Sequence, residues 1–124
     1  MSDNQLVTLS RQFAVEIIIV CDEVRERKNS SVLSNQLMRC GTSIGANIHE
    51  ANYASSRADF INKLHIALKE CYETEYWLTI LRDVSAISID TYKNLSEKCS
   101  KIRILLITSI RTAKRNMVKN DVKC

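Results

Sequence analysis

The sequence contains no proline, only two glycines and 6% aromatic residues. Because β-rich chains need many turn residues and proline interrupts helices, this scarcity excludes an all-β fold and favours long helices with short connections. The longest apolar run, residues 17–21, is far too short to cross a bilayer, so we expect no membrane contact. No signal peptide is recognisable, which predicts a cytoplasmic protein.

The five cysteines include no pair with the CxxC spacing of metal-binding or redox sites. An odd number of cysteines also argues against a framework of disulfides. Four of them fall on apolar helical stripes, so we expect buried free thiols. These are Cys21, Cys40, Cys71 and Cys99.

With 124 residues, of which 45% are hydrophobic and 26% charged, the chain is long enough for one domain with one core. Apolar residues recur at steps of three and four, which predicts helices. We expect helices at about residues 4–28, 31–52, 56–83 and 89–119. Because the connections are short, the predicted fold is all-α, an antiparallel up-down-up-down four-helix bundle in a single domain, 1–124.

Both glycines lie four positions apart in the second predicted helix, at Gly41 and Gly45. Glycine inside a helix costs about 1 kcal/mol relative to alanine, so each requires a packing reason. We expect a close approach of another helix at these positions.

Two of the predicted helices have apolar residues outside their core-facing stripe. In the first helix these are Val7, Val15 and Ile18, and in the fourth they are Ile104 and Ile107. A monomeric bundle buries one stripe per helix, and additional apolar surface is typical of an interface. These residues therefore predict a homo-oligomer.

Positive charge is concentrated near the C-terminus. Residues 98–123 include eight basic residues and one acid, whereas the rest of the chain has ten basic and thirteen acidic residues. Such a segment could bind RNA or DNA. The candidate contacts are Arg103, Arg111, Lys114, Arg115 and Lys119. The alternative is a solvated helix face that only aids solubility, on a chain that acts as a protein–protein scaffold or adaptor.

Several polar residues lie near the core-facing stripes of the second and third helices. They are Ser43, Asn47, Glu50 and Glu75. Glu75 falls within an apolar stripe, and a buried carboxylate needs a partner. A catalytic group formed by Asn47, Glu50 and Glu75 is one interpretation, but no nucleophile has an evident base. We favour a structural polar core in which Ser43, Asn47 and Glu75 bond to one another, and we predict no enzymatic activity.

A di-iron site in a four-helix bundle requires Glu-x-x-His on two helices. The residues three positions before His49 and His65 are Ala46 and Asn62, so the sequence predicts no metal and no cofactor.

Three aromatic residues, Tyr72, Tyr76 and Trp77, lie off the stripe of the third helix. Burial in an interface, packing at the edge of the bundle and stacking of bases are all open for them.

Three segments carry a family resemblance: residues 43–51 (SIGANIHEA), 56–60 (SRADF) and 66–78 (IALKECYETEYWL). They resemble a family of small bacterial four-helix bundles whose first members are encoded in intervening sequences of 23S ribosomal RNA genes. The resemblance implies a left-handed bundle, a ring of five subunits and no enzymatic activity. The family is related to accessory proteins of diversity-generating retroelements, which implies nucleic acid and a reverse transcriptase as partners.

Overall fold

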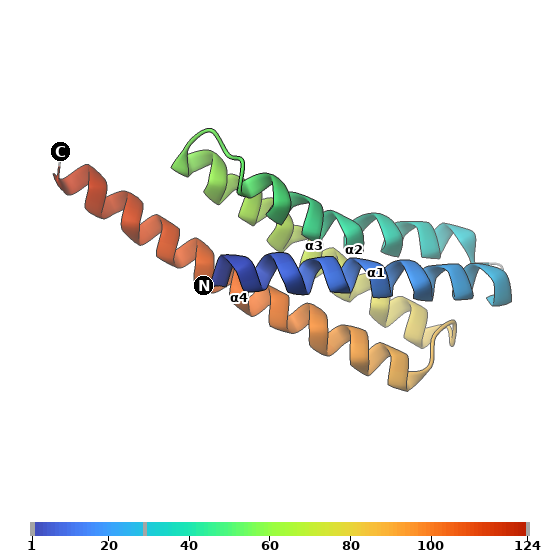
Figure 1. Cartoon of the computed structure of the whole chain (residues 1–124). Coiled ribbons are helices and arrows are strands. Elements are labelled where there is room, and N and C mark those ends of the chain that lie inside the picture. Colours follow the sequence, from blue (N-terminus) through green and yellow to red (C-terminus); the bar gives the residue numbers. More distant parts are fainter. Residues whose placement is uncertain (1, 29, 124) are drawn as a thin grey trace.

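The computed structural model describes residues 2–28 and 30–123, and the side chains of residues 5–26 and 30–118. Over these ranges the chain forms four helices (Figure 1): α1 (Ser2–Lys28), α2 (Ser31–Ala51), α3 (Arg57–Asp83) and α4 (Ile89–Lys123). The same ranges contain no strand, so the predicted all-α class is confirmed. The helix ends agree closely with the prediction except in α4, which runs to Lys123 because neither proline nor glycine interrupts it.

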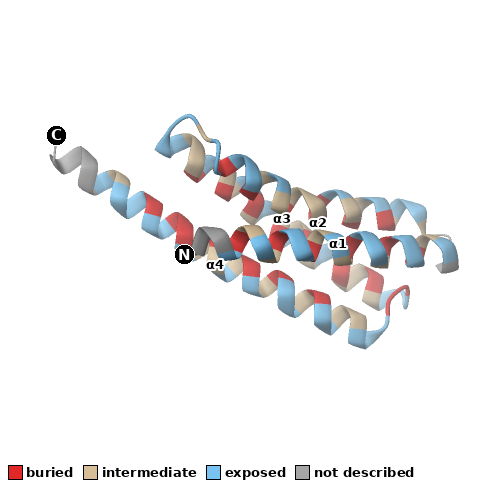
Figure 2. Ribbon diagram, in the orientation of Figure 1, coloured by how far each residue is buried: buried red, intermediate tan, exposed pale blue. Residues whose placement is uncertain are grey.

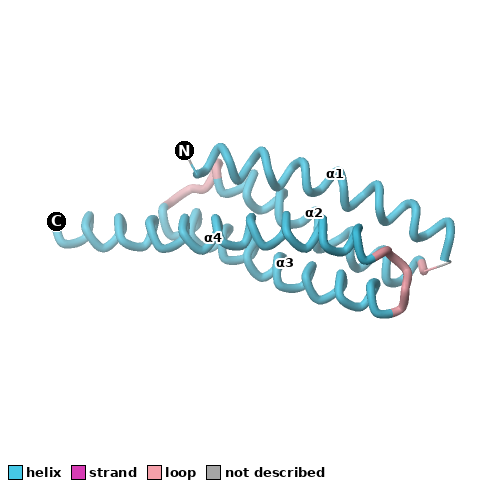
Figure 3. The backbone as a smooth tube through the Cα atoms, turned by 90° about the horizontal axis from the view of Figure 1, so that it is seen from below, coloured by secondary structure: helices cyan, strands magenta, loops and turns pink. Residues whose placement is uncertain are grey.

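Each helix packs against the next one in the chain, and α1 also packs against α4, which closes a four-helix bundle. Successive helices run in opposite directions in Figures 1 and 3, in agreement with the predicted up-down-up-down order. The left-handed twist stays a prediction. In both views the C-terminal part of α4 extends beyond the ends of the other helices, so this part of the surface lacks a neighbouring helix.

Hydroxyl groups cap the starts of α3 and α4. The Asp59 N–H donates to Ser56 Oγ at 3.0 Å, and the Ser55 N–H donates to Asp59 Oδ2 at 3.2 Å. At the start of α4 the Thr91 N–H donates to Ser88 Oγ at 3.0 Å. Each cap satisfies backbone donors that a helix start leaves free.

The core is formed by inward-facing aliphatic side chains of all four helices (Figure 2). Burial of each large aliphatic side chain stabilises the fold by about 1.5–3 kcal/mol relative to exposure. Each helix also contributes one buried free thiol, from Cys21, Cys40, Cys71 and Cys99, as predicted. None of the described helices has the length and apolar character that a membrane crossing requires.

Candidate nucleic-acid interface

The first half of α4 is tied to its neighbours by two ion pairs. Lys98 Nζ lies 2.7 Å from Glu16 Oε1 on α1, and Arg103 Nε lies 2.9 Å from Glu75 Oε1 on α3. Arg103 Nη2 also donates to Ser100 Oγ at 3.5 Å. The hydrogen bond to Glu75 raises the pKa of the Arg103 guanidinium. These two cations therefore help to hold α4 in the bundle.

The described cations further along α4 have no such partners. Arg111, Lys114 and Arg115 are exposed, and among the described side chains none of them has a hydrogen-bond or ion-pair partner. All three lie in the C-terminal half of α4, and the C-terminal part of this helix extends past the rest of the bundle in Figure 1. Lys119, the fifth predicted contact, lies outside the described side chains. A cation without an ion-pair partner can bind a phosphate without first breaking a salt bridge.

The predicted mutual bonding of Ser43, Asn47 and Glu75 is wrong. Ser43 Oγ donates to the Arg39 carbonyl oxygen at 2.6 Å, and Asn47 Nδ2 donates to the Ser43 carbonyl oxygen at 2.9 Å. Both side chains thus bond to the preceding turn of their own helix, as short polar side chains within helices commonly do. Glu75 instead pairs across the bundle with Arg103 of α4.

Glu50 does not belong to a polar core either, because it is exposed and accepts a hydrogen bond from Lys63 Nζ at 3.3 Å. The three residues weighed as a catalytic group therefore have separate partners. Asn47 bonds within α2, Glu50 pairs with Lys63 of α3, and Glu75 pairs with Arg103 of α4. The structure gives them no common hydrogen-bond network.

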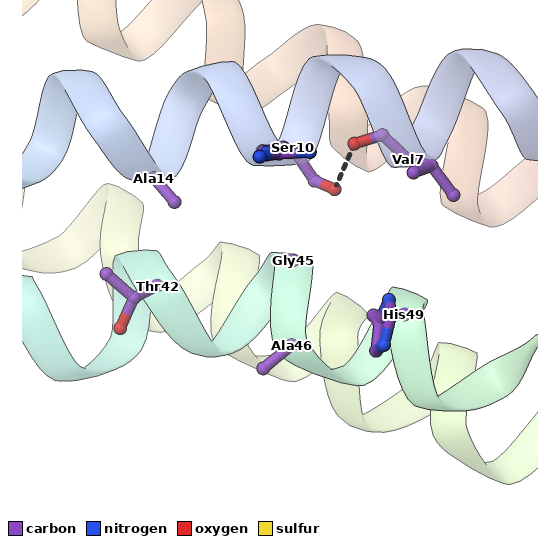
Figure 4. Close-up of a pocket in the computed structure, with 8 residues that line it drawn as sticks. Val7, Ser10, Ala14, Thr42, Gly45, Ala46 and His49 are labelled. Carbon is purple, nitrogen blue, oxygen red and sulfur yellow. Dashed lines mark hydrogen bonds between the residues drawn. The ribbon is translucent and has the colours of Figure 1, made fainter.

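A groove of about 350 Å³ lies between α1 and α2 (Figure 4). Small side chains form much of its wall. Both glycines of α2 lie where α1 approaches α2 closely. A Cβ atom at Gly45 would lie 3.3 Å from the Ser10 carbonyl oxygen, and one at Gly41 would lie 3.0 Å from Ile17 Cγ2. The predicted close approach of a helix at both glycines is thereby confirmed. The groove is lined by Val7, Ser10, Arg11, Ala14, Thr42, Gly45, Ala46 and His49.

The five apolar residues predicted outside the core differ in their exposure. Val15 is 53% exposed, Ile18 40% and Ile104 58%. Val7 is half-buried at the wall of the α1–α2 groove, and Ile107 is half-buried on α4. Exposed aliphatic side chains of this size on α1 and α4 are available for contact with another molecule.

On α3, Tyr72 is 51% and Tyr76 57% exposed, while Trp77 is half-buried. Trp77 Nε1 donates to Glu73 Oε2 at 3.2 Å, and its ring meets that of Tyr76 edge-on with the centroids 5.1 Å apart. The Arg103 guanidinium lies 5.9 Å from the centroid of the Tyr72 ring, within the range of a cation–π contact. The exposed Tyr72 thus stands beside a cation of α4.

Arg39 of α2 pairs with both Glu70 and Glu73 of α3. The hydrogen bond from Arg39 holds the pKa of the Glu73 carboxyl below its ordinary value. No pattern in the sequence singles out Arg39, because its partners lie 31 and 34 positions away and a helical period describes only one helix. Within the described side chains, no group of three or more His, Cys, Asp or Glu residues is placed to hold a metal ion.

Comparison with known proteins identifies a family and a similar solved structure. The model of the 23S rRNA-intervening sequence protein family matches residues 2–108. A crystal structure described as a protein with unknown function from the S23 ribosomal protein family of Bacteroides thetaiotaomicron is 46% identical to this chain. It superimposes with a TM-score of 0.88, and the match covers 90% of this chain and 99% of the other. Comparison with curated proteins gives no match.

Proposed function

The chain belongs to the 23S rRNA-intervening sequence protein family, and from this premise we propose that it is a non-enzymatic, homo-oligomeric protein of the cytoplasm that binds RNA or DNA through α4. The group of free cations Arg111, Lys114 and Arg115 carries the proposal. All three are exposed on the C-terminal half of α4, so a phosphate backbone reaches them from the solvent. Contacts of this kind supply affinity that is largely independent of sequence.

The test is a binding titration with labelled RNA and with duplex DNA over a series of salt concentrations. Neutralising Arg111, Lys114 and Arg115 to glutamine should weaken binding to every sequence by a similar factor. It should also reduce the slope of log affinity against log salt by about one unit for each phosphate that the variant no longer neutralises. Absence of binding at about 50 mM salt, or an affinity indifferent to salt, contradicts the proposal.

Lys93 provides the matched control, because it is an exposed cation on the same helix but near its start, remote from the extended end. Lys93→Gln removes the same charge from the chain while leaving the three free cations in place. It should leave the salt slope unchanged. An equal effect of Lys93→Gln and Lys114→Gln would indicate a response to net charge alone.

The homo-oligomeric part of the proposal is supported by the exposed apolar residues Val15, Ile18 and Ile104 on α1 and α4. Patches on two different helices fit a contact in which different surfaces of two copies meet, and such contacts close into rings when the rotation permits. The proposed assembly is a homopentamer. Light scattering that gives a 14.2 kDa species at micromolar concentration contradicts any assembly.

The same exposed apolar residues also support a second candidate function, a scaffold or adaptor that binds another protein and no nucleic acid. A pull-down with the tagged protein from a lysate treated with nuclease separates the two candidates. A protein partner that survives nuclease, together with absence of direct binding to purified RNA, favours the scaffold.

A further inference from the structure

Aromatic and basic side chains share one surface where α3 packs against α4. We define the α3–α4 face as Lys69, Tyr72 and Tyr76 of α3 together with Arg103, Arg111 and Lys114 of α4. At 100° per residue, the three α3 residues fall within about 60° of one another around that helix, and the three α4 residues fall within about 80° of one another around theirs. The contact between Arg103 and the Tyr72 ring joins the two rows.

Each acid around these tyrosines already has a basic partner, although two of them share one arginine. Glu70 and Glu73 pair with Arg39 on the α2 side of α3, and Glu75 pairs with Arg103. Acidic neighbours would otherwise repel phosphate from the aromatic rings. The face also carries three exposed cations that have no ion-pair partner among the described side chains: Lys69, one turn before Tyr72 on α3, and Arg111 and Lys114 further along α4.

The geometry of the face matches a flexible strand better than a rigid duplex. Arg103 and Lys114 are separated by about 16 Å along α4 at a rise of 1.5 Å per residue, a span of several nucleotides. Tyr72 and Tyr76 are half exposed in the same region, and their flat rings offer a stacking surface that a base in a duplex cannot reach. Glu75 and Ser100 hold Arg103 beside Tyr72, so this part of the surface is formed before any ligand arrives.

We propose that the α3–α4 face binds single-stranded nucleic acid, with an unpaired base stacked on Tyr72 and the phosphates on Arg111 and Lys114. This inference rests on the proposed function, because it assigns to the free cations of α4 a particular class of ligand. Stacking on tyrosine is tolerant of sequence, so the face selects unpaired over paired bases rather than one base over another.

The experiment measures the fluorescence anisotropy of a labelled strand of about 16 nucleotides, alone and annealed to its complement, at low salt. Tyr72→Ala should weaken binding of the single strand roughly ten- to hundred-fold and leave duplex binding nearly unchanged. Tyr72→Phe keeps the ring and should bind the single strand like the wild type. The matched control is Tyr53→Ala, because Tyr53 is 78% exposed but packs beside His49 of α2, outside the face.

Each outcome decides a different point. If Tyr72→Ala leaves single-strand affinity intact while the glutamine variants of Arg111 and Lys114 weaken it, the base-stacking inference falls and the proposed function stands. If Tyr72→Ala changes the mass of the oligomer and not the affinity, the face is a contact between copies, and the inference is again overturned. If the wild type binds neither probe at low salt, the proposed function itself fails.

Discussion

A methyl group at Gly41 has no room beside α1. A Cβ atom there would lie 3.0 Å from Ile17 Cγ2 and 3.1 Å from Ile17 Cγ1, and Ile17 is fully buried. Gly41→Ala gains about 1 kcal/mol in helix propensity, whereas overpacking of a core costs about 1–3 kcal/mol. We therefore expect a net loss of roughly 1 kcal/mol in the free energy of unfolding, equivalent to about 3–5 °C in Tm.

Two substitutions at Ile17 test whether its side chain causes this loss of stability. Ile17→Ala removes both γ carbons and by itself costs about 2–5 kcal/mol, but in that background Gly41→Ala should become stabilising by about 1 kcal/mol. Ile17→Val keeps both γ carbons, so it should give Gly41→Ala no relief. Chemical denaturation followed by circular dichroism, at one protein concentration for all variants, supplies the free energies. If Gly41→Ala has the same effect in the wild-type and the Ile17→Ala backgrounds, steric contact with Ile17 is not the reason for the glycine.

Three further changes test other parts of the structure. Burial raises the pKa of the Cys21 thiol to about 12 from an ordinary value of 9.0, so the unfolded chain loses this proton first and stability should fall between pH 9 and about 12. Cys21→Ala should flatten that decline in denaturation curves. Arg103→Gln should lower the unfolding free energy by about 1 kcal/mol, and adding Glu75→Gln should cost little more in a double-mutant cycle. Val15→Asp combined with Ile104→Asp should reduce the mass found by light scattering while leaving the helical circular dichroism intact, since both side chains are exposed.

The fold could be predicted from local patterns because nearly every core position belongs to a helical stripe, and the exceptions are Ala86 and Ile87 in the connection between α3 and α4. Leu6, Phe13, Ile17 and Val24 recur at a helical spacing in the sequence and are all buried in the structure. The absence of proline and the short connections then leave few arrangements other than a bundle. The close approach of another helix at the two glycines was likewise predictable. Glycine inside a helix lowers stability, and close packing must offset this loss.

The partners of polar side chains could not be predicted in the same way. The apolar stripe of α3 places Glu75 near the core but does not say whether α2 or α4 covers it. A cover by α2 would favour Asn47 as the partner, whereas in the structure the partner is Arg103 of α4. Ser43 and Asn47 also had a local alternative, the carbonyl groups one turn earlier, which needs no tertiary contact. Cross-helix ion pairs join residues far apart in sequence, and periodicity within one helix contains no information about them.

Some cations of α4 are free and others are paired with carboxylates. The salt dependence of binding therefore reports how many subunits contact one strand. A duplex held by the three free cations Arg111, Lys114 and Arg115 of one subunit should bind about 40-fold more weakly after a fourfold rise in salt, and a single strand held by Arg111 and Lys114 about 7-fold more weakly. If several subunits of one oligomer contact the same strand, the logarithmic slope increases in proportion to their number. Lys98 and Arg103 add little to the slope, because each already neutralises a carboxylate. A titration with the Val15→Asp, Ile104→Asp double variant should therefore return the one-subunit slope, whereas an unchanged slope means that each subunit binds its own strand.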